Sequence, residues 1–316
     1  MRSLTFVIQG PNLDTDENKI TSNLILSIRN FFPDSTIIFS TWENETIHKL
    51  PNLDKIVFNS DPGGILYHKE LNILNNVNRQ IVSTLNGLLG VETEYAIKVR
   101  SDLVFKSNVI VNNLKYLGLS GGDQNFKLLS NHVVVSNQTS VDPRKRLAYP
   151  FHLCDWIYCG KTQDLINIWD IPLMPEDWFQ SFAPDDTFNN VGNSYLSRYL
   201  PESYIISSFV KKYMDISFQD SYDIKNNNIE ISELIIANNF IVKSNFQLGI
   251  RSQKYNKKIR TLLPMYTYTS WKNLAKKKDI EGFEIQLDLL AIILPIINSF
   301  KFLFIFSGKL KKITKF

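Results

Sequence analysis

Cysteine and histidine are scarce in this sequence, and their scarcity limits the kinds of site that it can build. The 316 residues include two cysteines, Cys154 and Cys159, and four histidines. On one strand, residues five positions apart lie about 16 Å from each other on opposite faces, too far for a disulfide. The histidines show no ligand spacing. We therefore expect neither a disulfide nor a thiolate or histidine metal site, in keeping with a reducing, cytoplasmic setting.

Two phosphate-binding motifs are also missing. Neither G-x-G-x-x-G nor G-x-x-x-x-G-K-[ST] occurs, so dinucleotide-binding and P-loop proteins are disfavoured because their glycine-rich phosphate cradle is absent. The net charge of +4 is too small to indicate a nucleic-acid partner, and we expect none.

Hydrophobic residues are plentiful, at 44% of the chain, and they follow a regular order. Apolar runs predict strands at 4–8, 36–40, 55–59 and 95–99, and helical spacing predicts helices at 20–31 and 71–88. Further strands are predicted at 126–129, 133–135, 151–160, 239–242 and 246–250, and helices at 163–169 and 200–209. This order predicts an α/β fold with a mostly parallel sheet and covering helices.

Polar or glycine-containing loops follow the first predicted strands, as at Gln9-Gly10, Thr41-Trp42 and Arg100-Ser101-Asp102. Because the carboxyl ends of parallel strands meet at one edge of a sheet, these loops should build one crevice. Arg100 can grip a phosphate in a fork, and Asp102 can hold a divalent cation that bridges phosphate oxygens. The alternative is a salt bridge at the end of the strand.

The second predicted helix carries an unusual polar face, made of Asn75, Asn76, Arg79 and Ser83. A solvated face is one interpretation. An arginine among asparagines with no acid nearby in sequence instead favours a contact with phosphate or carboxylate.

Two acids are candidates for proton transfer. Glu202 begins a predicted helix after the irregular stretch 174–192, whose length indicates a binding loop. It could instead serve only the helix dipole. Asp155 lies three residues after His152 on a predicted strand, so these two side chains should point to opposite faces.

Seven segments in order give the chain a family resemblance: IQGP (8–11), SIRNFFP (27–33), STWE (40–43), NRQIVSTLNGL (78–88), KVRSDL (98–103), FHLCDWIYCG (151–160) and LPESYI (200–205). Together they resemble the WavE-type lipopolysaccharide synthesis family. The resemblance implies a glycosyltransferase of GT-A-like architecture that acts on lipopolysaccharide or surface polysaccharide. In that architecture a D-x-D motif after the fourth strand holds a divalent metal, Mn or Mg. Here Arg100 replaces its first acid and leaves Asp102 as the one metal carboxylate.

The resemblance also implies roles for single residues. Gln9, Gly10, Thr41 and Trp42 would contact the nucleoside of a nucleotide-sugar donor, whereas Arg79, Lys98 and Arg100 would meet its diphosphate. Asp102 would bind the metal or the ribose. Glu202 is the first candidate for the base that deprotonates the acceptor, and Asp155 is the second. Two alternatives remain open: a nucleotidyltransferase, and a non-catalytic polysaccharide-assembly protein of the same fold.

The last part of the chain differs from the rest. Leu289–Phe306 is apolar but interrupted by Pro295 and Lys301, and four lysines follow it. We expect this tail to be helical and to lie on an anionic membrane surface without crossing it, close to a lipid-linked or oligosaccharide acceptor. The expected organisation is a Rossmann-like nucleotide-sugar-binding half (1–120), an acceptor-binding and catalytic half (121–280) and this peripheral, membrane-associating tail (281–316).

Overall fold

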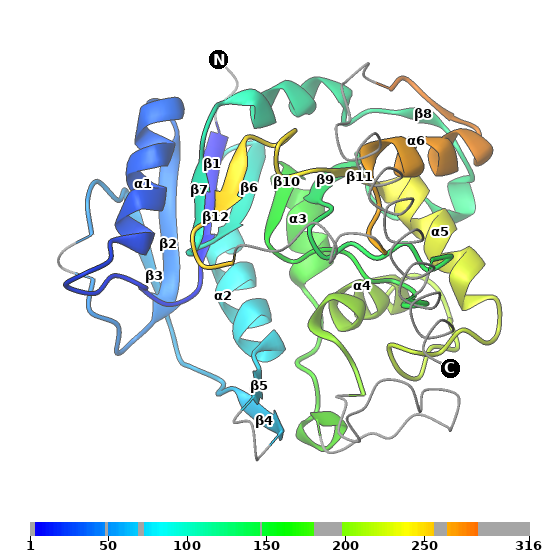
Figure 1. The fold of residues 1–316 in the computed structure, drawn as a ribbon, viewed down its shortest axis with the longest axis horizontal. Coiled ribbons are helices and arrows are strands. Elements are labelled where there is room, and N and C mark those ends of the chain that lie inside the picture. The colour runs from blue at the N-terminus through cyan, green and yellow to red at the C-terminus, as the bar shows by residue number, and fades with distance from the viewer. Residues whose placement is uncertain are drawn as a thin grey trace, which may run out of the picture.

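A seven-stranded sheet runs through the centre of the molecule (Figure 1). The structure is a computed structural model and describes residues 4–47, 50–68, 73–145, 147–179, 198–255 and 264–283. The order of the strands across the sheet is β3-β2-β1-β6-β10-β9-β11. Their bounds are β1 (Leu4–Gln9), β2 (Thr36–Trp42), β3 (Lys55–Asn59), β6 (Tyr95–Arg100), β9 (Val133–Ser136), β10 (Ile157–Lys161) and β11 (Phe240–Lys243).

Parallel pairing dominates this sheet. Strand β10 is antiparallel to both of its neighbours, β6 and β9, and the other adjacent strands pair in parallel. The expected fold class, an α/β fold with a mostly parallel sheet, is therefore confirmed. In the register, Gln9 at the end of β1 lies opposite Ser40 of β2 and Arg100 of β6. The central strands thus end at one level, so the residues that follow them share one edge.

Three two-stranded ribbons surround the main sheet. They pair β7 (Leu103–Phe105) with β12 (Ile250–Ser252), β8 (Ser120–Gly121) with β13 (Ile280–Glu281), and β4 (Ile65–His68) with β5 (Ile73–Asn75). The helices are α1 (Ile20–Phe31), α2 (Val77–Leu89), α3 (Thr162–Trp169), α4 (Pro201–Lys211), α5 (Asn228–Asn239) and α6 (Tyr268–Lys277). Short 3₁₀ turns are η1 (Val109–Tyr116), η2 (Gln124–Phe126) and η3 (Glu176–Phe179).

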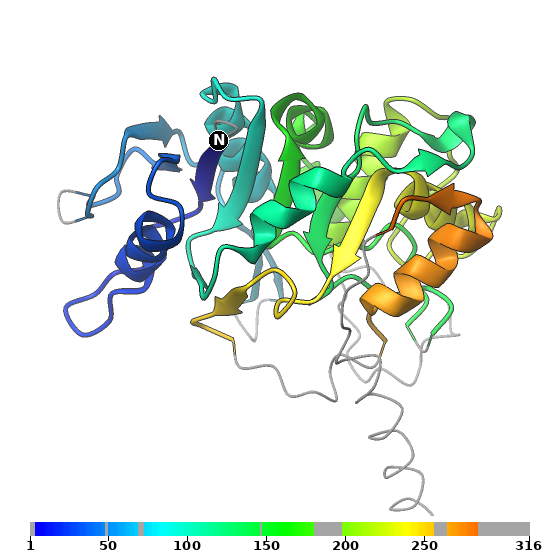
Figure 2. The same ribbon diagram turned by 90° about the horizontal axis from the view of Figure 1, so that it is seen from above.

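Helices cover both faces of the sheet, which explains why its central strands β1 and β6 are buried almost throughout. Helices α2 and α3 pack on one face, and α1 packs with the β7–β12 ribbon on the other (Figure 2). Every residue of β1 is buried, as expected for a parallel strand covered on both sides.

Gly87 allows α2 to pack very close to the sheet. A Cβ atom at this position would lie 2.5 Å from Cγ1 of Val7 and 2.9 Å from Cβ of Ser40, both shorter than van der Waals contact. The start of α2, which carries Arg79, is thereby held above the ends of β1 and β2.

Four predicted elements differ in the structure, and one of them, the strand predicted at 151–160, is shortened to β10 (Ile157–Lys161). The second helix begins at Val77 rather than at residue 71, because residues 73–75 form β5 and the side chain of Asn75 accepts the N–H of Val77 at 3.0 Å. Residues 126–129 form no strand, since the side chain of Asn239 binds the backbone of Leu128 and Leu129 instead. The strand predicted at 246–250 is also different, because residues 246–249 form a turn. Strand β12, which begins at Ile250, pairs with β7 and is not part of the main sheet.

The two expected halves of the chain share one sheet, to which residues 121–280 contribute β9, β10 and β11. Cys154 and Cys159 are free and buried. Within the part of the chain that the structure describes, none of the helices has the length and apolarity needed to cross a membrane. Most of the expected tail, from residue 284, and residues 180–192 of the irregular stretch lie outside the described residues.

The buried imidazole of His132 generates a prediction about pH. Its Nε2 lies 3.2 Å from the carbonyl oxygen of Ala237, and burial lowers its pKa from 6.5 to about 4. In the unfolded chain the imidazole therefore takes up a proton near pH 6.5, whereas in the folded chain it does so only near pH 4. The free energy of unfolding consequently decreases as the pH falls from about 6.5 to about 4. His132→Gln, which does not titrate, should remove about 3 kcal/mol of this loss. Urea unfolding at pH 7 and pH 4 measures it; an equal loss in both proteins would contradict it.

Candidate functional site

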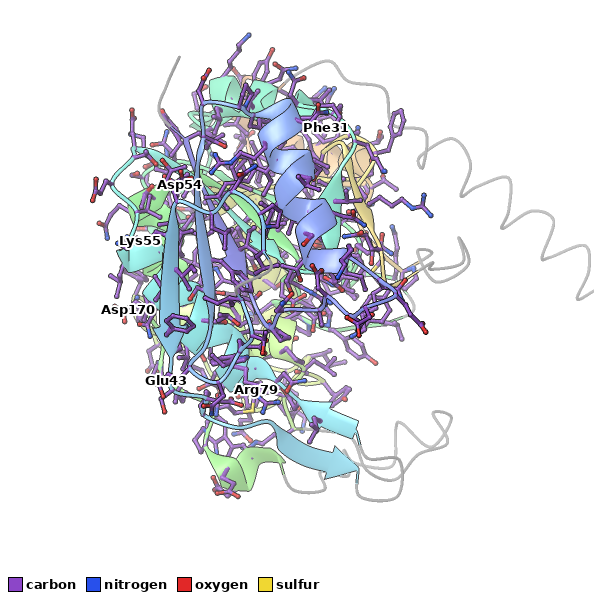
Figure 3. The ribbon with its side chains drawn as sticks, turned by 90° about the vertical axis from the view of Figure 1, so that its left-hand side faces the viewer. Phe31, Glu43, Asp54, Lys55, Arg79 and Asp170 are labelled. Carbon is purple, nitrogen blue, oxygen red and sulfur yellow. The ribbon has the colours of Figure 1, made fainter. Side chains whose placement is uncertain are left out.

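A cavity of about 640 Å³ opens at the carboxyl ends of β1, β2 and β6. Its walls come from widely separated parts of the chain and include Gln9, Trp42, Arg79, Arg100, Pro201 and Lys254. Figure 3 shows that Arg79 and Glu43, which follows β2, lie at this end of the sheet, whereas Asp54 and Lys55 lie at the other end. The crevice predicted from the strand-end loops is present.

The floor of the cavity depends on a backbone turn after β1. Gly10 has a φ of +116°, a conformation that other residues rarely adopt, and its N–H donates to the carbonyl of Ser40 at 3.2 Å. The N–H of Ser101 donates to the carbonyl of Gln9 at 3.1 Å. These bonds join the ends of β1, β2 and β6 directly beneath the cavity.

Arg100 is the most heavily contacted charge at this edge. Its guanidinium donates to both carboxylate oxygens of Asp102, at 3.1 and 2.7 Å, and lies 3.9 Å from Asp155. The rings of Trp156 and Tyr255 lie 5.1 and 5.8 Å away. Burial alone would lower the pKa of Arg100, but Asp155 and Asp102 outweigh it and raise the pKa above its ordinary value. The group is permanently charged.

Arg79 has a carboxylate partner of its own. Its guanidinium donates to Asp61 at 2.8 and 2.6 Å and to the side chain of Asn76 at 3.0 Å. The hydrogen bond with Asp61 raises the pKa of Arg79, and it lowers the pKa of Asp61. A contact with a carboxylate is one of the two contacts that the sequence favoured for Arg79, and the partner, Asp61, is distant in sequence.

Two cavity groups have polar atoms without partners. The side-chain oxygens of Gln9 and Gln80 are buried and accept no hydrogen bond within the described ranges. An unpaired buried acceptor is costly, so both amides are well suited to a ligand that donates hydrogen bonds. Gln9 was anticipated from the sequence, but Gln80, one residue beyond Arg79, was not.

Two of the expected donor contacts lie away from the cavity. Thr41 is fully buried and is absent from the cavity wall, because it points to the face of β2 opposite Trp42. Lys98 lies two residues before the end of β6 and is also fully buried. Its Nζ donates to the carbonyl of Asp155 and lies 4.7 Å from the ring of Trp169. Burial lowers the pKa of Lys98 to about 8. The predicted contact of Lys98 with diphosphate is therefore corrected to a structural role beneath Asp155.

Glu202 and Asp155 lie just behind the wall of the cavity. Leu200 and Pro201 line it, and the next residue, Glu202, has its carboxylate 3.7 Å from Nε2 of His152. Burial raises the pKa of Glu202, His152 lowers it, and Asp155 raises it further, with a net increase. Residues 151–156 are not a strand, so the alternation argument does not apply to His152. The contact of His152 with Glu202 joins distant segments, and no local pattern predicts it.

The donors around Asp102 do not fit the metal that the sequence suggested. Both carboxylate oxygens are bound by Arg100, whose positive charge repels a cation. No group of three or more histidine, cysteine, aspartate or glutamate side chains that could hold a metal occurs among the residues described. A hard cation needs several oxygen ligands, and Asp102 offers none that is free.

The comparison with protein families agrees with the motifs. The family model described as WavE lipopolysaccharide synthesis matches residues 4–293. The chain belongs to the WavE family. A comparison with curated proteins gives no match.

Two of the solved structures that match this WavE protein resemble it only weakly. A 4-diphosphocytidyl-2C-methyl-D-erythritol synthase from Anaerococcus prevotii is 10% identical, with a TM-score of 0.33 over 56% of this chain and 81% of the other. HddC from Yersinia pseudotuberculosis, complexed with GMP-PN, is 12% identical, with a TM-score of 0.33 over 55% and 81%. Likenesses this weak carry no statement about function.

The pairing of Arg79 with Asp61 generates a prediction about anion binding in the cavity. An anion that uses Arg79 must compete with Asp61, so Asp61→Asn should strengthen the binding of inorganic pyrophosphate by about two- to fivefold, the effect of an exposed ion pair. Isothermal titration calorimetry measures the affinity. Asp54→Asn is the matched control, because Asp54 pairs with Arg29 at the opposite end of the sheet. Unchanged or weaker binding in Asp61→Asn would exclude this competition.

Proposed function

We propose that this WavE protein is a glycosyltransferase, which transfers a sugar from a nucleotide-diphosphate donor to a lipopolysaccharide or surface-polysaccharide acceptor. The observation that carries the proposal is the cavity at the carboxyl ends of the parallel strands, with the permanently charged Arg100 in its wall. Ligands of open α/β sheets bind at this edge. A volume of about 640 Å³ also suits a small-molecule ligand. Membership of a lipopolysaccharide synthesis family supports the acceptor class.

The donor would lie across the strand ends. In this proposal its nucleoside contacts Gln9, Gly10 and Trp42, and the unpaired oxygens of Gln9 and Gln80 accept hydrogen bonds from it. Its diphosphate lies between Arg79 and Arg100, whose planar forks match phosphate oxygens. Asp102 keeps the Arg100 fork in one orientation through two hydrogen bonds.

Sugar transfer requires two contributions from the protein: stabilisation of the leaving diphosphate and deprotonation of the acceptor. The bond between the anomeric carbon and the diphosphate oxygen breaks, and negative charge grows on that oxygen. A fixed guanidinium at that place stabilises the transition state. The acceptor hydroxyl loses its proton as its oxygen bonds to the anomeric carbon, and a base must take that proton.

Glu202 remains our first candidate for this base. Its raised pKa brings it closer to neutral pH, where a general base works best, and the residue before it lines the cavity. Asp155, the second candidate, is less available for two reasons. Its carboxylate lies 3.9 Å from Arg100, and its side chain is only 5% exposed.

The test of function is turnover of a nucleotide sugar. The purified protein, screened against nucleotide sugars, should slowly release free sugar and nucleoside diphosphate without an acceptor. Release of pyrophosphate from a nucleoside triphosphate and a sugar phosphate would instead indicate a nucleotidyltransferase. Nucleotide binding without turnover in either assay would indicate a non-catalytic assembly protein. Either result would overturn the transferase proposal.

The same assay tests the base. Glu202→Gln keeps the shape of the side chain but cannot take a proton, so turnover should fall by on the order of 10²–10⁴ while donor binding is retained. Glu176→Gln, which changes an acid of η3 that does not line the cavity, is the control and should leave turnover unchanged. Loss of donor binding in Glu202→Gln would assign Glu202 a structural role.

We also propose that the protein works at a membrane surface. Exposed Lys276 and Lys277 at the end of α6 precede the apolar and basic segment 284–316. Lysines favour anionic headgroups, and apolar residues favour burial in the membrane interface. Full-length protein should float with anionic vesicles and less so at high salt, and a variant truncated after Gly282 should not float. Equal flotation of the two proteins would exclude the tail as the cause.

A further inference from the structure

A short segment from late in the chain is fixed beside the cavity and forms part of its wall. It comprises Gln253, Lys254 and Tyr255, here called the 253–255 arm. The N–H of Gln253 donates to the carbonyl of Asp102 at 2.9 Å, and its side chain donates to the carbonyls of Leu103 and Ile20, each at 2.8 Å. These bonds attach the arm to β7 and to α1, so that its next two side chains lie in the wall of the cavity.

Lys254 differs from the two arginines of the cavity. Arg79 and Arg100 each donate two hydrogen bonds to an aspartate. Lys254 is exposed and has no carboxylate within ion-pair distance among the residues that the structure describes. An incoming anion therefore meets an uncompensated charge at Lys254, whereas at the arginines it must compete with carboxylates.

Tyr255 presents an open aromatic face beside this charge. Its ring stacks on Trp156 at 6.0 Å with an interplanar angle of 28°, and yet 45% of the residue stays exposed. Trp42, the aromatic residue expected to stack on the nucleoside, is only 8% exposed. Tyr255 is therefore the better platform for a flat ring, since Trp156 supports its ring and almost half of the residue stays exposed. The Nζ of Lys254 lies 5.9 Å from the centre of the same ring, so charge and ring are side by side.

We propose that the 253–255 arm is a ligand-binding subsite, in which Lys254 binds a phosphate of a nucleoside diphosphate and Tyr255 stacks on its base. This proposal rests on the proposed function for the class of ligand, but it concerns binding and not turnover. A cation and a ring on neighbouring residues match a ligand whose charge and base are joined by one ribose.

The experiment separates charge from ring. Inorganic pyrophosphate and the four common nucleoside diphosphates are titrated calorimetrically into the full-length protein. Lys254→Met should weaken binding of both kinds of probe by about tenfold, in line with one charge-assisted contact. Tyr255→Ala should weaken the best nucleoside diphosphate by about tenfold, as loss of base stacking does, and leave pyrophosphate within about twofold. Lys254→Arg keeps the charge and should bind pyrophosphate nearly as well as the unaltered protein.

Two control variants repeat the same chemical changes elsewhere. Lys276→Met removes an exposed lysine from α6, and Tyr213→Ala removes a tyrosine that is 48% exposed and outside the cavity. Neither should change binding of any probe. Equal losses in a control and in its arm variant would show a general effect of charge or stability and would overturn the proposal.

The outcomes also separate this proposal from the transferase. If the arm variants weaken binding as described and no nucleotide sugar turns over, the subsite stands and the transferase fails. If nucleotide sugars turn over but both arm variants bind the probes like the unaltered protein, the subsite is refuted and the transferase stands. If the unaltered protein binds none of the probes, the subsite is refuted as well.

Discussion

The charge of Arg100 organises the end of the sheet. A charged group that is largely withdrawn from water must be compensated by opposite charge and hydrogen bonds. Asp102 supplies two bonds, Asp155 a second negative charge, and Trp156 and Tyr255 two aromatic rings. Because these partners belong to separate segments, compensating one guanidinium brings together the turn after β6, the segment before β10 and the 253–255 arm.

Lys98 supports this arrangement from below. Its ammonium group binds the carbonyl of Asp155 and so holds the backbone whose carboxylate faces Arg100. Beside them, Asp155 raises the pKa of Glu202 and His152 lowers it. A change at any of these positions would alter the charge felt by the others, so the cavity and the acids behind it form one electrostatic unit.

The walls of the cavity carry nearly balanced charge. The described part of the wall has three basic residues and three acidic ones, which are Arg79, Arg100 and Lys254 and Glu45, Asp61 and Asp102. Burial raises the pKa of Glu45, although a hydrogen bond from the backbone of Asn12 lowers it. Such a site does not attract anions simply by net charge. In the function proposed above, selection would come from geometry, since a diphosphate bound by both arginines gains bonds that a monovalent anion cannot make together.

Local patterns determined much of the fold. The strands at 55–59 and 133–135 and the helix at 163–169 follow from apolar periodicity and are found within a residue of their predicted bounds. The edge that carries the cavity follows from parallel order alone. Helix α5 was missed because its buried residues include Ser232, Asn238 and Asn239, so that no apolar stripe marks it. The side chain of Asn239 donates to the distant carbonyl of Phe126, whereas that of Asn238 donates to the carbonyl of Leu234 in the same helix.

The sequence by itself determined which chemical groups stand at the strand ends, because the polar residues after each strand are local features. It named Gln9, Trp42, Arg79 and Arg100, and all four line the cavity. Only the tertiary structure decided what those groups contact. Asp61 reaches Arg79 across 18 positions, and Tyr255 reaches the ring of Trp156 across 99. Thr41 and Lys98 were misplaced for the same reason: the side of a strand on which a residue is covered depends on packing, and contacts between distant segments leave no periodic pattern in the chain.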